Sequence, residues 1–305
     1  MKVAYISDPV FALHDTGEWH PESAMRMLAL QRAVKPMEKS LIHLSPVKVS
    51  AKLIETVHTL EHIENVRAHC EALEPIDADT VCVKESWDAA LAAVGAGIVA
   101  VDAVTDALAK RVFCGIRPPG HHATRSKAMG FCLFNNIAVT ARYAQTRGYQ
   151  KVAIIDFDVH HGNGTQDIFY DDGSVLYLST HQSPAYPGSG NSDERGSGEG
   201  VGTTFNFPFA PGSGDDLVVP LYEERLGPIL DDFSPDILLV SAGYDLHEAD
   251  PLAGLAVTTE GVGRIVDAIL KASDAPVIFM LEGGYNIDAL QECVEITLKK
   301  MTETL

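Results

Sequence analysis

The sequence contains few cysteines, and their arrangement excludes two common uses of this residue. Five cysteines occur among the 305 residues, at positions 70, 82, 114, 132 and 293. Their spacing is not that of a cysteine-based metal site, and an odd number of scattered cysteines does not fit a disulfide framework. We therefore expect free thiols in a reduced, cytoplasmic setting.

Basic residues are scarce as well. Lysine and arginine total 23 against 42 aspartates and glutamates, which gives a formal net charge of −19. A surface of this sign repels phosphate groups, so direct binding of nucleic acid is disfavoured, whereas cationic partners are attracted. The sequence also lacks a run of about 18 apolar residues and the apolar region of a signal peptide, so we expect no membrane span. It has no Gly-x-Ser-x-Gly motif, which argues against a serine hydrolase.

Strand-like and helix-like segments alternate along a chain that is 46% hydrophobic. The patterns predict strands at residues 3–6, 112–116, 152–157, 175–179, 237–241 and 277–281. They predict helices at residues 21–33, 62–73, 86–109, 136–147, 217–232 and 259–271. Such alternation is typical of an α/β fold with a mostly parallel sheet and helices on both faces. Because no linker or repeat divides the sequence, we expect a single domain over residues 1–305.

Four loops with chemically active residues each follow a predicted strand. They cover residues 117–122, 156–164, 242–245 and 282–286. In open parallel sheets, ligands bind at the carboxyl ends of the strands. We therefore expect these four loops to meet in one crevice, although they lie far apart in the sequence.

The segment Asp158-Val159-His160 is the strongest indication of a metal site. Residues two apart in an extended chain point to the same side, so a carboxylate and an imidazole can reach one cation. Asp156 lies one step further back on the same side, and Asp245 offers a third ligand after another strand. Two carboxylates and one imidazole suit Zn²⁺ or a similar divalent ion with a position open for water. Alone, Asp245 would rather be read as a helix or turn cap.

Two further loops carry candidate acid, base and hydrogen-bonding groups. His121 and His122 follow a rigid Pro-Pro-Gly turn, and imidazoles titrate near neutral pH, as general acids and bases must. The alternatives are a surface histidine pair or additional ligands. Tyr285 follows two glycines and is placed to donate a hydrogen bond to a developing oxyanion, unless it is only a packed turn residue. Phe131 and Tyr186 are loop aromatics that suit the walls of an alkyl-binding tunnel, or simply local core.

In chain order, these segments resemble the histone deacetylase superfamily. The resemblance runs from His14–Arg26 to Asn286 and rests on six motifs: Arg-Pro-Pro-Gly-His-His-Ala at 117–123, Asp-Phe-Asp-Val-His-His-Gly-Asn-Gly at 156–164, Tyr-Pro-Gly at 186–188, Ser-Ala-Gly-Tyr-Asp at 241–245, Asp-Pro-Leu-Ala-Gly at 250–254 and Glu-Gly-Gly-Tyr-Asn at 282–286. It implies the arginase/deacetylase fold, a single three-layer α/β domain around a central, mostly parallel sheet.

The resemblance also implies an activity and a catalytic set. It implies a zinc-dependent amidohydrolase that removes an acetyl or similar short acyl group from lysine or a small amine, using a metal-activated water. The implied zinc ligands are Asp158, His160 and Asp245. His122 matches the general base that later protonates the leaving amine, and Tyr285 matches the residue that polarises the amide carbonyl.

Neighbouring residues receive supporting roles by the same resemblance. His121 matches the electrostatic histidine, with Asp156 as its partner, and Asn163 stands beside His122 as in class II enzymes and their bacterial relatives. Glu282 likewise replaces the all-glycine run of class I. A potassium ion is implied at Asp156, Asp158, His160, Ser179 and Thr180.

The substrate tunnel is implied to consist of Gly130, Phe131, Tyr186 and Leu252. Polyamine-selective relatives in the animal branch carry Glu at the position of Leu252, so this residue favours acyl-lysine in peptides or proteins over small acylated amines. Three alternatives remain open: an acetylpolyamine amidohydrolase, an arginase-like ureohydrolase, and a non-catalytic acyl-lysine binding module. The ureohydrolase needs more Asp-rich ligand motifs, and the binding module should have lost a catalytic residue. The sequence leaves the oligomeric state open.

Overall fold

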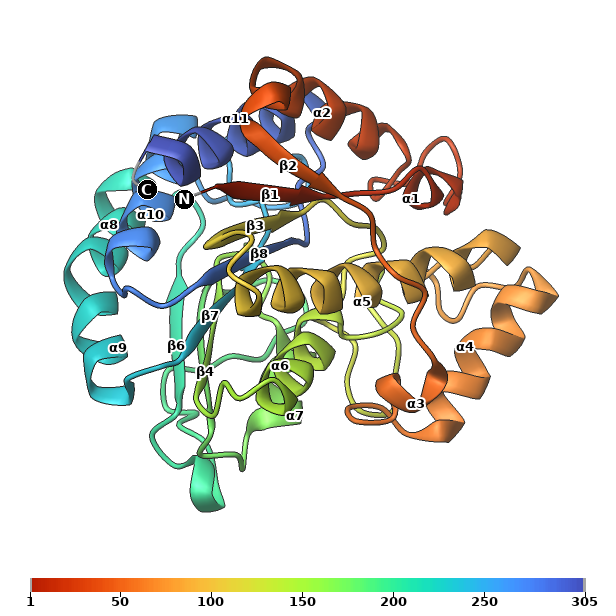
Figure 1. Ribbon diagram of the computed structural model, residues 1–305, viewed down its shortest axis with the longest axis horizontal. Helices are drawn as coiled ribbons and strands as arrows, with labels where there is room; N and C mark the ends of the chain where they lie inside the picture. The colour runs from red at the N-terminus through yellow and green to blue at the C-terminus, as the bar shows by residue number, and fades with distance from the viewer. Residues whose placement is uncertain (1, 304–305) are drawn as a thin grey trace.

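An eight-stranded sheet forms the centre of the computed structural model, which describes residues 2–303 (Figure 1). The strands are β1 (Val3–Ile6), β2 (Leu41–Leu44), β3 (Arg111–Cys114), β4 (Val152–Asp156), β5 (Val175–Gln182), β6 (Thr204–Phe209), β7 (Ile237–Ala242) and β8 (Val277–Leu281). Their order is β2-β1-β3-β8-β7-β4-β5-β6, and every pairing is parallel. The predicted parallel sheet is therefore confirmed.

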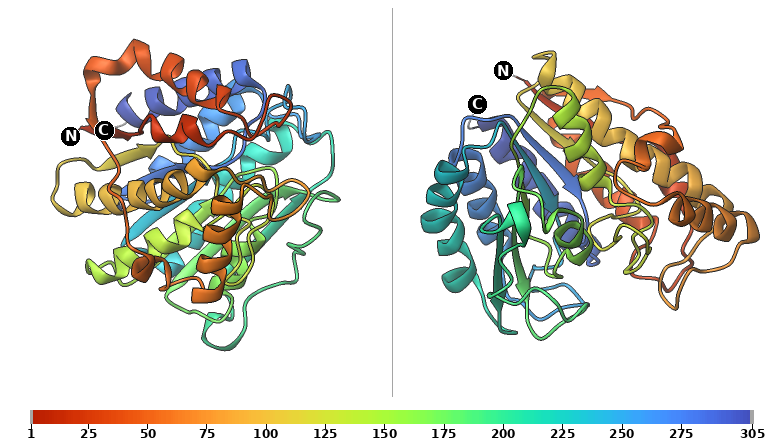
Figure 2. Two further views of the ribbon diagram at one scale, coloured as in Figure 1. Left: turned by 90° about the vertical axis from the view of Figure 1, so that its right-hand side faces the viewer. Right: turned by 90° about the horizontal axis from the view of Figure 1, so that it is seen from below.

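Helices cover both faces of the sheet, so that the molecule has three layers (Figure 2). One face carries α2 (Met25–Val34), α8 (Asp215–Pro220), α9 (Gly227–Phe233), α10 (Thr259–Lys271) and α11 (Ile287–Glu303). The other carries α5 (Lys84–Thr105), α6 (Asn136–Thr146) and α7 (Asn163–Phe169), with α4 (Leu60–Ala72) packed against α5. Short elements complete the chain: α1 (Val10–Leu13), α3 (Ala51–Ile54), η1 (Lys35–Ser40), η2 (Gly198–Gly200) and η3 (Leu221–Leu226). This arrangement confirms the expected α/β architecture.

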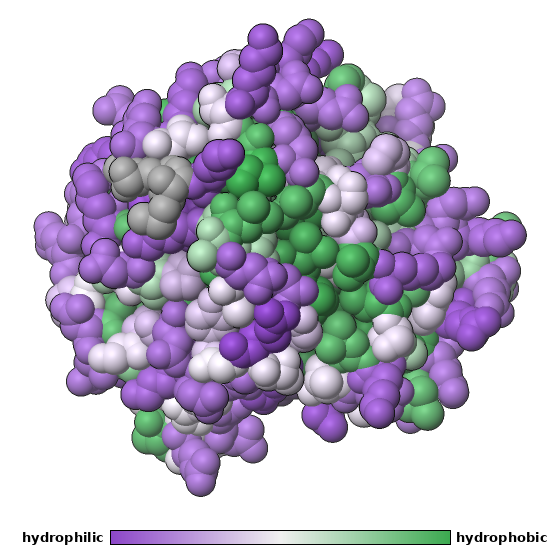
Figure 3. Space-filling view, in the orientation of Figure 1, coloured by the Kyte–Doolittle hydropathy of each residue, from purple (hydrophilic) through white to green (hydrophobic). Residues whose placement is uncertain are grey.

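The long apolar helix α5 lies in the core, as its composition predicts. Its alanines and valines pack against β1, β3 and β8 on one side and against α4 and α6 on the other. Among the described residues, this one helix is long and apolar enough to cross a membrane, but 67% of its most apolar window is buried within the protein. Packing in the core accounts for its hydropathy. Figure 3 shows a band of apolar residues on the face of the molecule that carries α5.

The structure differs from the sequence-based expectation at the sheet edges and in two of the longer helical segments. The edge strands β2 and β6 were not predicted, and neither was α11. β6 contains Pro208, which is tolerated only because an edge strand has unpaired backbone groups. The helix predicted at 217–232 is split into α8, the π-helical η3 and α9, since Pro220 removes a backbone donor from the helical ladder.

The sheet register brings the four expected loops to one edge. Asp156 at the end of β4 lies between Ser179 of β5 and Ser241 of β7, and β7 ends beside β8. Because all strands point the same way, the loops after β3, β4, β7 and β8 leave the sheet on the same side. The four loops therefore lie at one end of the strands, as the sequence predicts.

Candidate metal centre and active site

Asp158, His160 and Asp245 converge at the carboxyl ends of β4 and β7. His160 Nδ1 lies 3.2 Å from Asp158 Oδ1 and 3.1 Å from Asp245 Oδ2. One ligand atom from each residue lies within 4.8 Å of the others, and both carboxylates are buried. The three predicted ligands therefore face a common point.

The backbone around this point holds both carboxylates in place. Gly283 N–H donates to Asp158 Oδ2 over 2.8 Å, and Val159 N–H donates to Asp245 Oδ1 over 3.0 Å. A Cβ atom on Gly283 would collide with Asp158 and Asp245, so this close approach of the backbone requires glycine. Such outer contacts orient metal ligands and set their affinity.

The electrostatics of the three residues favour a bound cation. Burial, reinforced by the charge of Asp158, raises the pKa of Asp245 to about 7. For His160, burial is outweighed by the two carboxylates, which raise its pKa to about 10. A cation at this point would offset the repulsion between the carboxylates of Asp158 and Asp245, both of which the His160 ring now contacts. Two oxygens and one imidazole nitrogen are a ligand set that suits Zn²⁺.

His122 is held as a neutral imidazole with a defined tautomer. Its Nδ1 lies 2.8 Å from Asn163 Oδ1, while the amide nitrogen of Asn163 donates to Met129 Sδ. That amide orientation makes His122 Nδ1 the donor and leaves a lone pair on Nε2. Burial, followed by the charges of His121 and His160, holds the pKa of His122 well below its usual range. The ring is thus ready to accept a proton at Nε2.

The adjacent His121 has the opposite electrostatic environment. Its Nδ1 lies 3.1 Å from Asp156 Oδ2 and its Nε2 lies 3.8 Å from Asp158 Oδ1. Burial opposes protonation, but the carboxylates of Asp158, Asp156 and Glu282 outweigh it and raise the pKa of His121 well above its usual range. The two neighbouring imidazoles, with ring centres 4.0 Å apart, therefore have pKa values shifted in opposite directions.

Tyr285 stands over the same cavity as a neutral phenol. Burial and the charges of Asp245 and Asp158 raise its pKa well above its usual value. Asp250 Oδ2 accepts from Tyr285 N–H over 2.7 Å, and the Arg26 guanidinium lies 5.3 Å from the centre of the phenol ring. These contacts hold Tyr285 in place, and its protonated hydroxyl can donate a hydrogen bond.

A tunnel of about 210 Å³ leads to these groups. It is lined by Asp79, His122, Gly130, Phe131, His160, Tyr186, Leu252 and Tyr285. The Tyr186 ring lies edge-on to His122 at 5.1 Å, and the Phe131 ring lies edge-on to Tyr285 at 5.8 Å. Gly130 has φ +54°, and a Cβ atom there would press on the His122 ring. The structure therefore brings together all four residues expected in the tunnel, and adds Asp79.

The residues expected to hold potassium lie directly behind the metal centre. Asp156 accepts from the Tyr177 hydroxyl over 3.1 Å and from Asp158 N–H over 3.2 Å. Ser179 is its register partner on β5, with its hydroxyl 2.9 Å from His181 Nδ1. The Thr180 hydroxyl contacts Tyr222 instead. These contacts place the residues side by side, and potassium binding stays a prediction.

Buried ion pairs and hydrogen bonds that the sequence did not predict support the site. Glu22 is fully buried and pairs with both Arg117 and Arg26. Glu282 accepts from Gly120 N–H over 2.6 Å and from Ser241 Oγ over 3.1 Å, so it ties two of the loops to the end of β7. The only sequence signal for these contacts was the position of the residues inside the recognised motifs.

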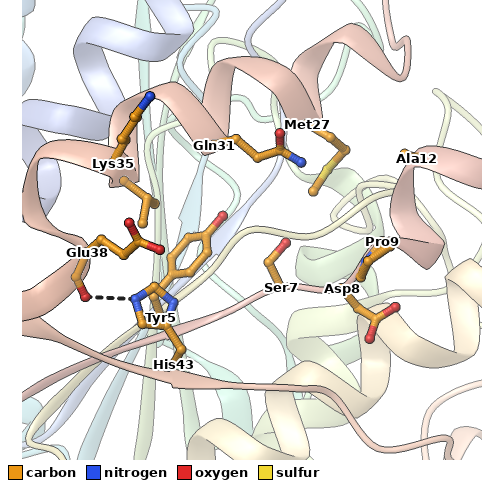
Figure 4. Close-up of a pocket in the computed structure, with 11 residues that line it drawn as sticks. Tyr5, Ser7, Asp8, Pro9, Ala12, Met27, Gln31, Lys35, Glu38 and His43 are labelled. Carbon is orange, nitrogen blue, oxygen red and sulfur yellow. Dashed lines mark hydrogen bonds between the residues drawn. The ribbon is translucent and has the colours of Figure 1, made fainter.

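A larger hollow of about 390 Å³ lies elsewhere, between α2 and the ends of β1 and β2 (Figure 4). It contains none of the residues of the metal centre. Several of its polar groups are already paired within the protein: Ser7 donates to Gly115 O, Asp8 accepts from Val10 N–H, and His43 contacts Glu38 O. The smaller tunnel is therefore the candidate active site.

Comparisons with known proteins agree with this geometry. Residues 20–301 match the model of the histone deacetylase domain. The chain is 40% identical to "Histone deacetylase 10, chloroplastic" of Oryza sativa subsp. japonica, over 97% of this chain and 72% of the rice protein. Its structure is similar to the crystal structure of the HDA15 HD domain, with a TM-score of 0.94 and 35% identity over 98% of this chain and 91% of that one. It is also similar to an acetylpolyamine aminohydrolase from Burkholderia pseudomallei, with a TM-score of 0.88 and 28% identity over 99% of each chain.

Proposed function

The chain belongs to the histone deacetylase family of amidohydrolases, and from this premise we propose that it is a zinc-dependent deacylase acting on N-acetyl-lysine or a similar short acyl-amine. One observation carries the proposal. A single cavity contains the Asp158-His160-Asp245 ligand set, a neutral histidine and a neutral tyrosine at the end of an aromatic tunnel. This combination supplies each group that amide hydrolysis at a metal requires.

A Zn²⁺ ion held by Asp158, His160 and Asp245 would polarise the acyl carbonyl and acidify the attacking water. His122 takes the proton of that water at Nε2, because its Nδ1–H is already donated to Asn163. The protonated His122 then returns this proton to the nitrogen of the departing amine. His121 stays protonated on Asp156 and keeps a positive charge beside the reacting carbonyl.

Tyr285 stabilises the negative charge that develops on the carbonyl oxygen. Its phenol keeps the proton because its pKa is raised, so its O–H can donate to the oxyanion. Asp250 holds the backbone of Tyr285 from one side, and Arg26 binds Gly284 O over 2.8 Å from the other. The donor is thus positioned before the substrate arrives.

The tunnel supports an unbranched acylated chain as substrate. Phe131 and Tyr186 present aromatic surfaces to the passage, and apolar Leu252 lies at its lining, which suits the methylenes of a lysine side chain. An acetylated polyamine is the second candidate. It is favoured by the similarity to the Burkholderia enzyme and by the carboxylate of Asp79 in the lining. We further propose a structural K⁺ at Asp156 and Ser179, and a cytoplasmic location.

A substrate panel on zinc-loaded protein tests this proposal. Metal content is measured first, and turnover is then compared for an acetyl-lysine peptide, N-acetylputrescine, and longer acyl-lysines. We expect one tightly bound zinc per chain and preferred turnover of the acetyl-lysine peptide. Preferred turnover of N-acetylputrescine would select the polyamine alternative, and absence of turnover of every acylated amine by the zinc-loaded protein would refute deacylation.

A further inference from the structure

An exposed tryptophan, Trp19, precedes a residue that contacts the tunnel wall. Trp19 is 91% exposed, which is unusual for the largest apolar side chain. The next residue, His20, packs its ring edge-on against the tunnel wall Phe131 at 4.8 Å. Trp19 therefore lies one residue away from a contact with the substrate passage.

The turn that carries Trp19 is firmly held. The Thr16 hydroxyl donates to Glu22 O over 2.5 Å, and Gly17 N–H donates to Asp15 Oδ1 over 3.0 Å. His20 Nε2 lies 3.0 Å from Asp79 O, which joins the turn to the loop that lines the tunnel. Trp19 is thus presented to solvent by a turn anchored at both ends, which leaves its aromatic face open to a ligand.

The surroundings of Trp19 are acidic. Asp15 and Glu18 flank it in the same turn, and residues 13–25 and 73–83 contain no lysine or arginine. Asp79 adds a carboxylate at the tunnel itself. Arg125 and Lys127 are the basic residues nearest in the sequence to the tunnel-wall residue Phe131, and they lie on the segment that precedes it. An aromatic face among carboxylates attracts a cation.

We propose that Trp19 binds the cationic side chain of a lysine or arginine that flanks the acyl-lysine of a peptide substrate. This inference rests on the proposed deacylase function and specifies its substrate class as basic peptides. A peptide suits the site because the apolar rim continues beyond the tunnel: Tyr186 and Leu252 are 42% and 41% exposed. A peptide backbone covers such a rim, whereas a linear polyamine leaves most of it in water.

The test uses three matched peptides in which acetyl-lysine is flanked by Arg, by Gln or by Glu, together with the minimal substrate N-acetyl-lysine amide. N-acetylspermidine provides the polyamine arm. Each is assayed for kcat/KM on the zinc-loaded wild type, Trp19→Ala, Trp19→Phe and Leu108→Ala. Leu108 is another exposed apolar residue, 47% exposed, and it precedes β3, at the opposite end of the strands from the four loops. Peptide Kd values are measured in parallel on the Tyr285→Phe background.

The wild type should prefer the Arg peptide to the Gln peptide, and the Glu peptide should be poorest. Trp19→Ala should reduce kcat/KM for the Arg peptide about three- to fivefold, the range of an exposed cation–π contact, and leave the minimal substrate unchanged. Trp19→Phe should keep most of the preference, and Leu108→Ala all of it.

Equal kcat/KM for the three peptides, or an unchanged preference in Trp19→Ala, would overturn the inference while turnover of the minimal substrate upholds the deacylase. A larger loss with N-acetylspermidine than with the Arg peptide would reassign the site to polyamines. If the minimal substrate is not turned over, the deacylase proposal fails, and equal Kd values for the three peptides then also reject Trp19 as a cation-binding residue.

Discussion

Replacing Glu22 with glutamine should severely destabilise this protein. Glu22, Arg26 and Arg117 are all fully buried. Glu22 Oε2 accepts from Arg117 over 2.8 Å and Oε1 accepts from Arg26 over 3.0 Å. Burial would raise the pKa of Glu22, but the two arginines outweigh it and lower that pKa to about 2. Glutamine keeps the shape and removes the only negative charge in this cluster.

The expected magnitude follows from the cost of leaving a buried charge without its partner. Removing one member of a buried ion pair costs about 3–5 kcal/mol, a large part of the stability of a typical domain. Equilibrium unfolding in urea measures this loss. The matched control is Glu71→Gln in the exposed Arg67–Glu71 pair, which has the same four-residue spacing and should change stability little.

The same variant should also lower activity in the protein that remains folded. Arg26 binds the carbonyls of Gly284 and Glu282 and lies over the Tyr285 ring, so its displacement moves the oxyanion donor. If the free energy of unfolding of Glu22→Gln lies within about 1 kcal/mol of that of the wild type, the stabilising role of this charge is refuted, because loss of one partner of a buried ion pair costs about 3–5 kcal/mol.

Three further predictions concern the site and the pH dependence of stability. Gly283→Ala should weaken zinc binding at least roughly tenfold, measured by competition with a chelator, because its Cβ atom would meet Asp158 and Asp245; unchanged affinity would contradict this. Glu282→Ala should act mainly on kcat, which should fall, and less on KM. Glu282→Gln should restore much of kcat, since an amide oxygen can still accept from Gly120 N–H. Equal kcat in both variants would argue against this role of Glu282. Burial lowers the pKa of His14 to about 4 from 6.5, so the unfolded chain binds the extra proton between these values. Stability should therefore fall by roughly 1.4 kcal/mol per pH unit from this histidine as the pH decreases from 6.5 towards 4, and His14→Gln should show a shallower decrease in urea unfolding.

The sequence was sufficient to predict the parallel sheet and the meeting of four loops. Both follow from local rules: buried strands are continuous apolar runs, and ligands bind at the carboxyl ends of parallel strands. Asp158 and His160 could be paired by their spacing alone. Asp245 could be joined to them only through the predicted topology and the family resemblance.

The parts that could not be predicted depend on distant contacts or on weak local signals. Glu22 and Arg117 are 95 residues apart, and no local pattern links a buried acid to a base at that separation. The edge strand β6 was not predicted because it contains Pro208, and a proline argues against a central strand. The split of the helix at 217–232 depends on Pro220. The spacing of apolar residues, from which that helix was predicted, does not reveal the effect of a proline.

We assign the chemistry to His122 and Tyr285, at a metal held by Asp158, His160 and Asp245. The most direct measurement is kcat for an acetyl-lysine peptide in zinc-loaded wild type, His122→Ala and Tyr285→Phe, with metal content and circular dichroism recorded for each. We expect normal folding, full zinc content and a loss of kcat of at least about 100-fold in each variant from this assignment. Rates close to the wild type in both variants, with zinc bound, would contradict it.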